Sequence, residues 1–311
     1  MQNLEIGTYG SPQLLTLPYD DRKKLIEQAE AAGLDHLFVG DHVSFHNGFG
    51  MDGLIDAATL AAMSCKLKVY VGVYLLALRH PVTVARQLSS LSRSAPGRVA
   101  IGVGLGGEDR HEMAICGTDP STRGKQTNHA MQALRQLLSG QSTTYHCDFF
   151  SFEDAIIQPP PSPQIPLMVG GRSDAAIERT ALYGDGWLGL WCSPKRFGQV
   201  VQQVKTLADE GERTAHNFQH GLQIWVGFGE QKNARQYVAK QMQEMYQMPF
   251  EPFEKYSPYG SPQDVAEFLA PYVEQGAQLF NVTPCGESFA HEIECVAEVN
   301  TLLKKEFSTV G

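Results

Sequence analysis

Asp41 and His42 are the residues whose types and position most strongly suggest chemistry, because they directly follow an apolar, strand-like run. Where parallel strands alternate with helices in a closed barrel, reactive groups lie at the C-terminal ends of the strands and in the following loops. A histidine titrates near neutral pH and can donate or accept a proton there. We predict that His42 is catalytic and that Asp41 fixes its tautomer. A histidine bonded only within its own loop is the open alternative.

A metal pair is a second interpretation of the same segment, because His46 lies four residues after His42. A tetrahedral zinc site needs further ligands, and the sequence offers no convincing third ligand at motif spacing. We therefore expect no metal site.

An anion site is predicted at Gly170, Gly171, Arg172 and Ser173, between a strand-like run and a helical segment that begins near Asp174. Free N–H groups at a helix N-terminus, a hydroxyl and a guanidinium can all face one phosphate. Ser173 acting only as the helix cap is the simpler alternative.

Gly102, Gly104 and Gly107 spell G-x-G-x-x-G after a strand-like run, a pattern shared with dinucleotide-binding turns. That fingerprint belongs to a tight turn that opens straight into a helix, usually in the first strand–helix unit. Here the sequence up to Gly124 predicts a loop, and three units precede it. We interpret the glycines as places where backbone approaches a flat ligand; tight packing is the alternative.

Two weaker signals complete the candidate site. Gly72 followed by Val73 within a buried strand often marks a bulge. Aromatic side chains near strand ends predict a substrate pocket lined by Tyr9, Phe45, Tyr74, Trp191 and Phe228. Such walls favour a largely apolar substrate.

The elements that must position these residues alternate along the whole chain. Helical periodicity predicts helices at 19–32, 56–64, from Pro81 onward, and at 127–138, 174–183, 196–209, 264–275 and 291–304. Apolar runs with β character predict strands at 4–9, 36–40, 68–76, 99–103, 166–169, 186–190, 222–226 and 279–283. Eight strand–helix units predict an α/β fold, a closed (β/α)8 TIM barrel; an open doubly wound sheet is the other arrangement that alternation permits.

Two long stretches, 104–165 and 230–260, exceed this alternation and are predicted as insertions after strands 4 and 7. Long insertions after barrel strands are usually functional loops over the mouth of the active site. We assign residues 1–311 to one barrel domain, which is an ordinary size for this fold.

The composition excludes several classes of protein. The net charge of −9 argues against binding to nucleic acid or to an anionic membrane, because both carry negative charge. No apolar run approaches the roughly 18 residues of a spanning helix, and the N-terminus lacks a signal-peptide pattern. The six cysteines form no C-x-x-C pair, so we expect reduced thiols in a cytoplasmic protein.

Together, segments spread over nearly the whole chain resemble the luciferase-like monooxygenase superfamily. Each segment alone is weakly specific, but their order and spacing match. They are Ala32-Gly33-Leu34-Asp35, Gly40-Asp41-His42, Arg79-His80-Pro81-Val82, Pro96-Gly97-Arg98, Gly102-Val103-Gly104 with Glu108, Arg123-Gly124, the run from Pro166 to Arg172, and Tyr183-Gly184-Asp185-Gly186-Trp187.

The resemblance implies a barrel, often dimeric, that binds FMN or the deazaflavin coenzyme F420 at the strand C-termini. In the deazaflavin branch, the residue matching His42 lies beside the reactive ring. The strand matching Gly72-Val73 carries a bulge with a non-prolyl cis peptide that backs the ring. Gly107, Glu108 and the loop 170–173 match regions that hold the ribityl phosphate, in agreement with the anion site predicted from the residues.

Two departures keep both cofactors open. Gly40 stands where deazaflavin enzymes often have serine or threonine, and Leu75-Leu76-Ala77-Leu78 is more apolar than its counterpart. We therefore expect an oxidoreductase that acts on a small, largely apolar molecule, either with reduced FMN and oxygen or by hydride transfer with F420. An FMN version would receive reduced flavin from a separate reductase, because the chain has no credible NAD fingerprint. A homodimer is expected.

Two other functions remain open from the sequence. One is a metal-dependent barrel hydrolase or isomerase that uses His42, His46, Asp41 or Glu108. The other is a flavin-binding barrel with no turnover of its own. Fold alone does not separate them, because barrels carry many unrelated chemistries.

Overall fold

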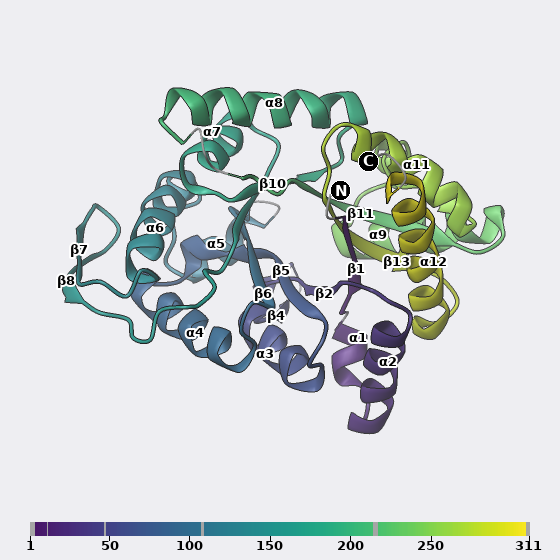
Figure 1. Ribbon diagram of the computed structural model, residues 1–311, viewed down its shortest axis with the longest axis horizontal. Coiled ribbons are helices and arrows are strands. Elements are labelled where there is room, and N and C mark those ends of the chain that lie inside the picture. The colour runs from purple at the N-terminus through teal and green to yellow at the C-terminus, as the bar shows by residue number, and fades with distance from the viewer. Residues whose placement is uncertain (1–3, 11, 47, 107–108, 214–216, 309–311) are drawn as a thin grey trace. The chain divides into compact units, whose positions relative to one another are not determined.

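The computed structural model describes residues 4–10, 12–46, 48–106, 109–213 and 217–308 (Figure 1). Its main sheet has the order β10-β9-β6-β5-β2-β1-β13-β11-β12, and a further pairing of β10 with β11 closes it. The eight barrel strands are β1 (Glu5–Tyr9), β2 (His36–Val39), β5 (Lys68–Leu75), β6 (Val99–Gly104), β9 (Leu167–Gly170), β10 (Gly186–Leu190), β11 (Gly221–Phe228) and β13 (Leu279–Cys285); the short β12 (Tyr259–Gly260) adds to β11. The predicted (β/α)8 barrel is confirmed, and the open sheet is excluded.

A helix follows each barrel strand, and local sequence signals mark the start of several of these helices. Asp52 caps α3 through two backbone N–H groups, Pro81 occupies the first position of α4, and Ser261 and Asp264 form a capping box on α11. The helices are α2 (Tyr19–Ala31), α3 (Gly53–Met63), α4 (Pro81–Ser94), α6 (Arg123–Leu137), α7 (Asp174–Tyr183), α8 (Pro194–Glu210), α11 (Pro262–Glu274) and α12 (Phe289–Ser308).

The remaining elements interrupt this alternation. The insertions after the fourth and seventh barrel strands are confirmed, whereas a hairpin that begins at His42 and a short helix at Arg110 were not predicted. These elements are α1 (Pro12–Thr16), β3 (His42–Phe45), β4 (Phe49–Met51), η1 (Leu76–Leu78), α5 (Arg110–Ile115), β7 (Thr143–His146), β8 (Ser151–Ala155), α9 (Gln231–Tyr246) and α10 (Glu251–Glu254).

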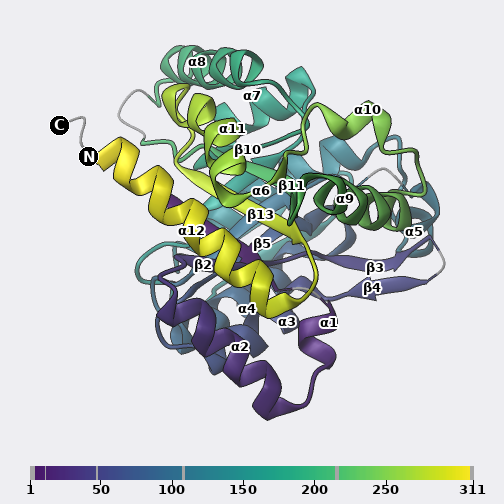
Figure 2. The same ribbon diagram turned by 90° about the vertical axis from the view of Figure 1, so that its right-hand side faces the viewer.

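Contacts group the chain into two compact units. Unit 1 comprises Met1–Phe38, Trp187–Thr206 and Phe218–Gly311, and unit 2 comprises Val39–Gly186 and Leu207–Asn217. Within unit 1, β1 and β11 both pair with β13, and α9 lies beside β11 (Figure 2). Assignment of residues 1–311 to one domain stays a prediction.

Unit 2 carries the segments that the sequence marks for chemistry. Its strands β5, β6 and β9 pair in parallel, with Ile101 of β6 opposite both Val71 and Leu167. The hairpin of β7 and β8 lies beside α6 (Figure 1), and the ribbon of β3 and β4 runs toward α5 (Figure 2). Within the described ranges, no helix is both long and apolar enough to cross a membrane.

Candidate functional site

His42 begins β3 and is held by a carboxylate from the neighbouring helix α5. Its Nδ1 lies 3.0 Å from Oε2 of Glu112, and the two side chains are 18% and 3% exposed. The ring of Phe45 stacks on the imidazole with centroids 4.1 Å apart. Because Nδ1 and one ring face are occupied, Nε2 is the nitrogen that His42 can offer to a ligand.

Glu112 also fixes the hairpin that carries His42. Its Oε1 accepts the backbone N–H groups of Val43 at 2.7 Å and Ser44 at 3.0 Å. Its neighbour Asp109 caps α5 and accepts the backbone N–H of His46 at 2.8 Å. Two carboxylates at one short helix therefore set both the position of β3 and the orientation of the histidine ring.

Asp41 does not orient His42, and that prediction is wrong. The Asp41 carboxylate is turned to Arg79, at 2.5 and 2.8 Å, and to the N–H groups of Leu75 at 2.8 Å and Gly53 at 3.0 Å. Burial raises the pKa of Asp41, and the Arg79 guanidinium and the two N–H groups oppose that rise. Asp41 instead ties the end of β2 to β5 and to the start of α3.

Glu112 and Arg79 are the residues that sequence reasoning missed as parts of the site. Arg79 occurred only as part of a matching motif, with no role. Glu112 lies where a loop was predicted, because α5 has six residues and too few to show helical periodicity. The available signal was Asp109, an N-cap residue with a glutamate three positions later, which is typical of a helix start.

The predicted irregularity in β5 is present. The register between β5 and β6 shifts between Val71 and Tyr74, and the peptide bond between Gly72 and Val73 is cis. The half-buried Val73 side chain lies against β6 and β9, where a Cβ at Gly104 would overlap its Cγ2 and a Cβ at Gly170 would lie 3.0 Å from its Cγ1.

This packing changes the interpretation of the glycines in β6. A Cβ at Gly102 would also lie 3.1 Å from Val73 Cγ1 and Tyr70 Oη. Side chains rather than open space therefore face Gly102 and Gly104, so the tight-packing alternative holds for both. Gly107 and Glu108, the other predicted phosphate contacts here, lie outside the described residues.

The loop between β9 and α7 was predicted as an anion site, and that assignment stays a prediction. Gly171 has φ +126°, which side chains rarely adopt, and a Cβ there would lie 3.0 Å from Ala176 Cβ. Ser173 caps α7 by accepting the N–H of Ala176 at 3.3 Å, so its hydroxyl hydrogen can still be donated to a ligand. Gly171, Arg172 and Ser173 are exposed, and Gly170 is half-buried.

The five predicted pocket residues divide between the units. In unit 2, Phe45 packs on His42 and the buried Tyr74 ring lies 4.5 Å from the Arg79 guanidinium carbon. In unit 1, Phe228 is fully buried, whereas Tyr9 and Trp191 are half-buried. Their assignment as pocket walls stays a prediction.

The residues of the metal alternative do not form a ligand set in the described part of the chain. No group of three histidine, cysteine, aspartate or glutamate side chains gathers there in a geometry that could hold a metal ion. His46 has φ +48°, and its ring lies tilted against that of Phe45 with centroids 4.0 Å apart.

Three known proteins are similar in sequence to parts of this chain. An uncharacterized protein of Mycobacterium tuberculosis is 28% identical over 210 residues, 61% of this chain and 72% of its own. The F420-dependent glucose-6-phosphate dehydrogenase of Beutenbergia cavernae is 32% identical over 167 residues, 51% of this chain and 49% of its own. Pyrimidine monooxygenase RutA of Allorhizobium ampelinum is 26% identical over 181 residues, 55% of this chain and 49% of its own.

Solved structures share the fold. An F420-dependent secondary alcohol dehydrogenase bound to an F420–acetone adduct superposes with a TM-score of 0.84 at 18% identity, covering 97% of this chain and 99% of that one. The oxygenating constituent of 3,6-diketocamphane monooxygenase from Pseudomonas putida, in complex with FMN, gives 0.73 at 14% identity, covering 94% and 96%. The family profile described as luciferase-like monooxygenase matches residues 4–275.

Proposed function

This chain belongs to the luciferase-like monooxygenase family and is an oxidoreductase, and we propose that His42 serves as its acid–base group beside a reduced flavin or deazaflavin. The observation that carries the proposal is the hydrogen bond between Glu112 and His42. His42 lies shortly after the end of β2, in the same unit as the irregular strand β5. A small molecule is the substrate class of the family.

The residues of unit 2 fit a phosphate-bearing cofactor. Gly171 leaves room where a side chain would meet α7, and the first N–H groups of a helix have no carbonyl partners within it. Gly170, Gly171, Arg172 and Ser173 would hold the phosphate, and Gly72 and Val73 would back the ring. When bound, the ring supplies two-electron redox chemistry that protein side chains lack.

The chain's own contribution is to place and move a proton. With the Glu112 carboxylate as acceptor, Nδ1–H of His42 donates the hydrogen bond between them, and Nε2 is then the nitrogen that can accept a proton. Nε2 would take the hydroxyl proton when a substrate alcohol is oxidised and return it in the reverse direction. Asp41, bonded to Arg79, keeps the ends of β2 and β5 together beneath this group.

We favour F420 and hydride transfer, because the B. cavernae relative is named for F420 and is 32% identical over the matched half of its length. The second candidate is an FMN-dependent monooxygenase, which the likeness to pyrimidine monooxygenase RutA supports. In that case a separate reductase would supply reduced flavin. A homodimer and a cytoplasmic location also belong to this proposal.

The test is His42→Ala, assayed by the absorbance change of F420 with a panel of secondary and aromatic alcohols. We expect turnover to fall by about a hundredfold or more while F420 and FMN affinities stay within twofold. His146→Ala on the β7–β8 hairpin is the matched control and keeps full activity. Unchanged turnover in His42→Ala, with cofactor bound, contradicts the proposal.

A further inference from the structure

Three half-buried aromatic side chains of unit 1 lie together: Trp191 directly after β10, Tyr246 at the end of α9, and Phe253 in α10. We name Trp191, Tyr246 and Phe253 the aromatic triplet. The Trp191 ring centroid lies 5.1 Å from that of Tyr246 and 4.5 Å from that of Phe253. These spacings are those of aromatic pairs that attract one another.

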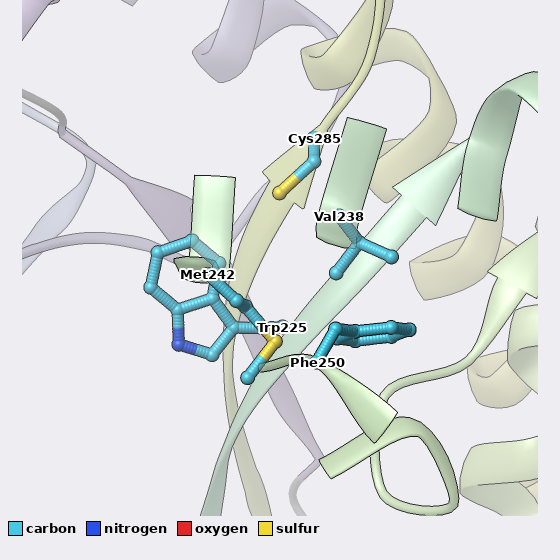
Figure 3. Packing of buried hydrophobic residues seen from close by; sticks show 5 residues of the cluster. All are labelled: Trp225, Val238, Met242, Phe250 and Cys285. Atoms are coloured by element: carbon cyan, nitrogen blue, oxygen red, sulfur yellow. The ribbon is translucent and has the colours of Figure 1, made fainter. Parts of the chain in front are cut away.

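The triplet rests on an apolar floor. Trp225 of β11 packs with Val238, Met242, Phe250 and Cys285, and each of the five is 8% exposed or less (Figure 3). Nε1 of Trp225 donates to Oη of Tyr246 at 3.2 Å, which fixes the tyrosine ring above the floor. The rings above this floor are therefore preorganised and do not need to be ordered by a ligand.

The backbone at Trp191 points to a binding role rather than simple packing. Trp191 has φ +50°, a left-handed conformation that is rare for a bulky residue. Such conformations are strained and cluster at ligand-binding and active sites. The position agrees, because in barrels substrate-binding groups follow the C-terminal ends of strands, as Trp191 follows β10.

Two charged residues next to the triplet, Arg235 and Glu254, form an ion pair. Arg235 of α9 donates to both carboxylate oxygens of Glu254, at 2.7 and 2.9 Å, and its guanidinium carbon lies 5.6 Å from the Phe250 ring. Tyr259 donates to the same carboxylate at 2.9 Å. A closed ion pair of this kind favours an uncharged ligand over a phosphate ester.

We infer that the aromatic triplet is a subsite for a planar, uncharged ring of the substrate, which contacts the rings of Trp191 and Phe253. This inference rests on the proposed function and makes its substrate class specific: an aromatic or conjugated alcohol or carbonyl compound rather than a sugar phosphate. The ring would add to the existing aromatic contacts of Trp191 with Tyr246 and Phe253, above the buried floor.

The test uses the full chain with 2-naphthol as the planar probe, and cyclohexanol and glucose 6-phosphate as comparators. Two of the three tryptophans of the chain, Trp191 and Trp225, belong to the triplet and its floor, so tryptophan fluorescence reports on the subsite. We expect saturable binding of 2-naphthol, about tenfold weaker binding in Phe253→Ala, and nearly full affinity in Tyr246→Phe, which keeps the ring.

Phe152→Ala, which removes a half-buried ring from the aromatic cluster of the β7–β8 hairpin, is the matched control and leaves 2-naphthol affinity unchanged. If Phe253→Ala loses its near-UV circular dichroism, Phe253→Leu replaces it with the same expectation. The subsite is overturned if Phe253→Ala, or Phe253→Leu in its place, binds 2-naphthol as tightly as the wild type does. It is also overturned if the wild type binds cyclohexanol as tightly as 2-naphthol. FMN and F420 affinities of the same variants stay unchanged, so failure of the cofactor proposal is seen separately.

Discussion

At the scale of single residues, the chemistry depends on which carboxylate faces the histidine. Asp41 precedes His42 in sequence, but it lies in the link between β2 and β3, and its carboxylate bonds Arg79. Glu112, seventy positions away, contacts the imidazole. Proximity in sequence was a poor guide here, because a side-chain contact across a hairpin and a helix is decided by tertiary packing.

Glu112→Gln tests the positioning role of this carboxylate. The amide oxygen can still accept the N–H groups of Val43 and Ser44, but the amide NH2 would face Nδ1 and force the proton of His42 onto Nε2. We expect kcat to fall about a hundredfold with KM and cofactor affinity nearly unchanged. Glu153→Gln, an exposed change on β8, serves as control; a loss confined to KM would refute a role through His42.

A second carboxylate, Glu292 on α12, predicts a pH dependence of stability. It is 7% exposed and accepts the N–H of Gly286 at 2.7 Å, and burial raises its pKa from 4.5 to about 7. Folding thus favours the protonated carboxyl, so its contribution is complete below pH 4.5 and is lost as pH rises through about 7.

Glu292→Gln keeps the acceptor and removes the titration. Relative to the wild type, we expect its free energy of unfolding to rise by roughly 3 kcal/mol between pH 5 and pH 8. Urea unfolding at the two pH values measures the difference. Parallel pH profiles of the two proteins would show that Glu292 does not titrate in this range.

At the scale of elements, the sequence predicted the barrel strands and their helices well and the inserted elements poorly. Strong periodicity located α7 at Asp174–Tyr183 and β10 at Gly186–Leu190, with both ends as predicted. The elements β3, β4 and α5 are three to six residues long, and β3 is held by the carboxylates of Asp109 and Glu112, which lie more than sixty positions away in sequence. Such short segments carry too little local signal to be recognised.

The packing of β5 on β6 gives a prediction at this scale. Gly104→Ala would place a Cβ against Val73, and overpacking of this kind costs about 1–3 kcal/mol. Gly124→Ala is the control, because it lies in α6 with its nearest neighbour, Arg179 Nη2, at 3.6 Å, and alanine favours a helix by up to about 1 kcal/mol. Chemical denaturation measures both.

A double variant identifies the cause of the Gly104 effect. Val73→Ala removes the methyl group that the new Cβ would meet, so the two changes together should cost less than their sum. Strict additivity would mean that Gly104 is required for a reason other than the Val73 side chain.

At the scale of the whole molecule, the fold was predictable and the cofactor was not. Eight alternating units predict a barrel, and the strand order closes one. The same scaffold serves F420-dependent dehydrogenases and FMN-bound monooxygenases among the similar structures, so architecture does not select between them. Selection between F420 and FMN depends on the contacts that the protein makes with the redox ring and the phosphate of the cofactor.

Equilibrium titration of the purified chain with F420 and with FMN is therefore the most direct test of the central claim. We predict saturable binding of F420 at about micromolar affinity, and at least tenfold weaker binding by Gly171→Val, whose side chain would meet Ala176 at the start of α7. Absence of binding by both cofactors at millimolar concentration, or unchanged affinity in Gly171→Val, would contradict the account.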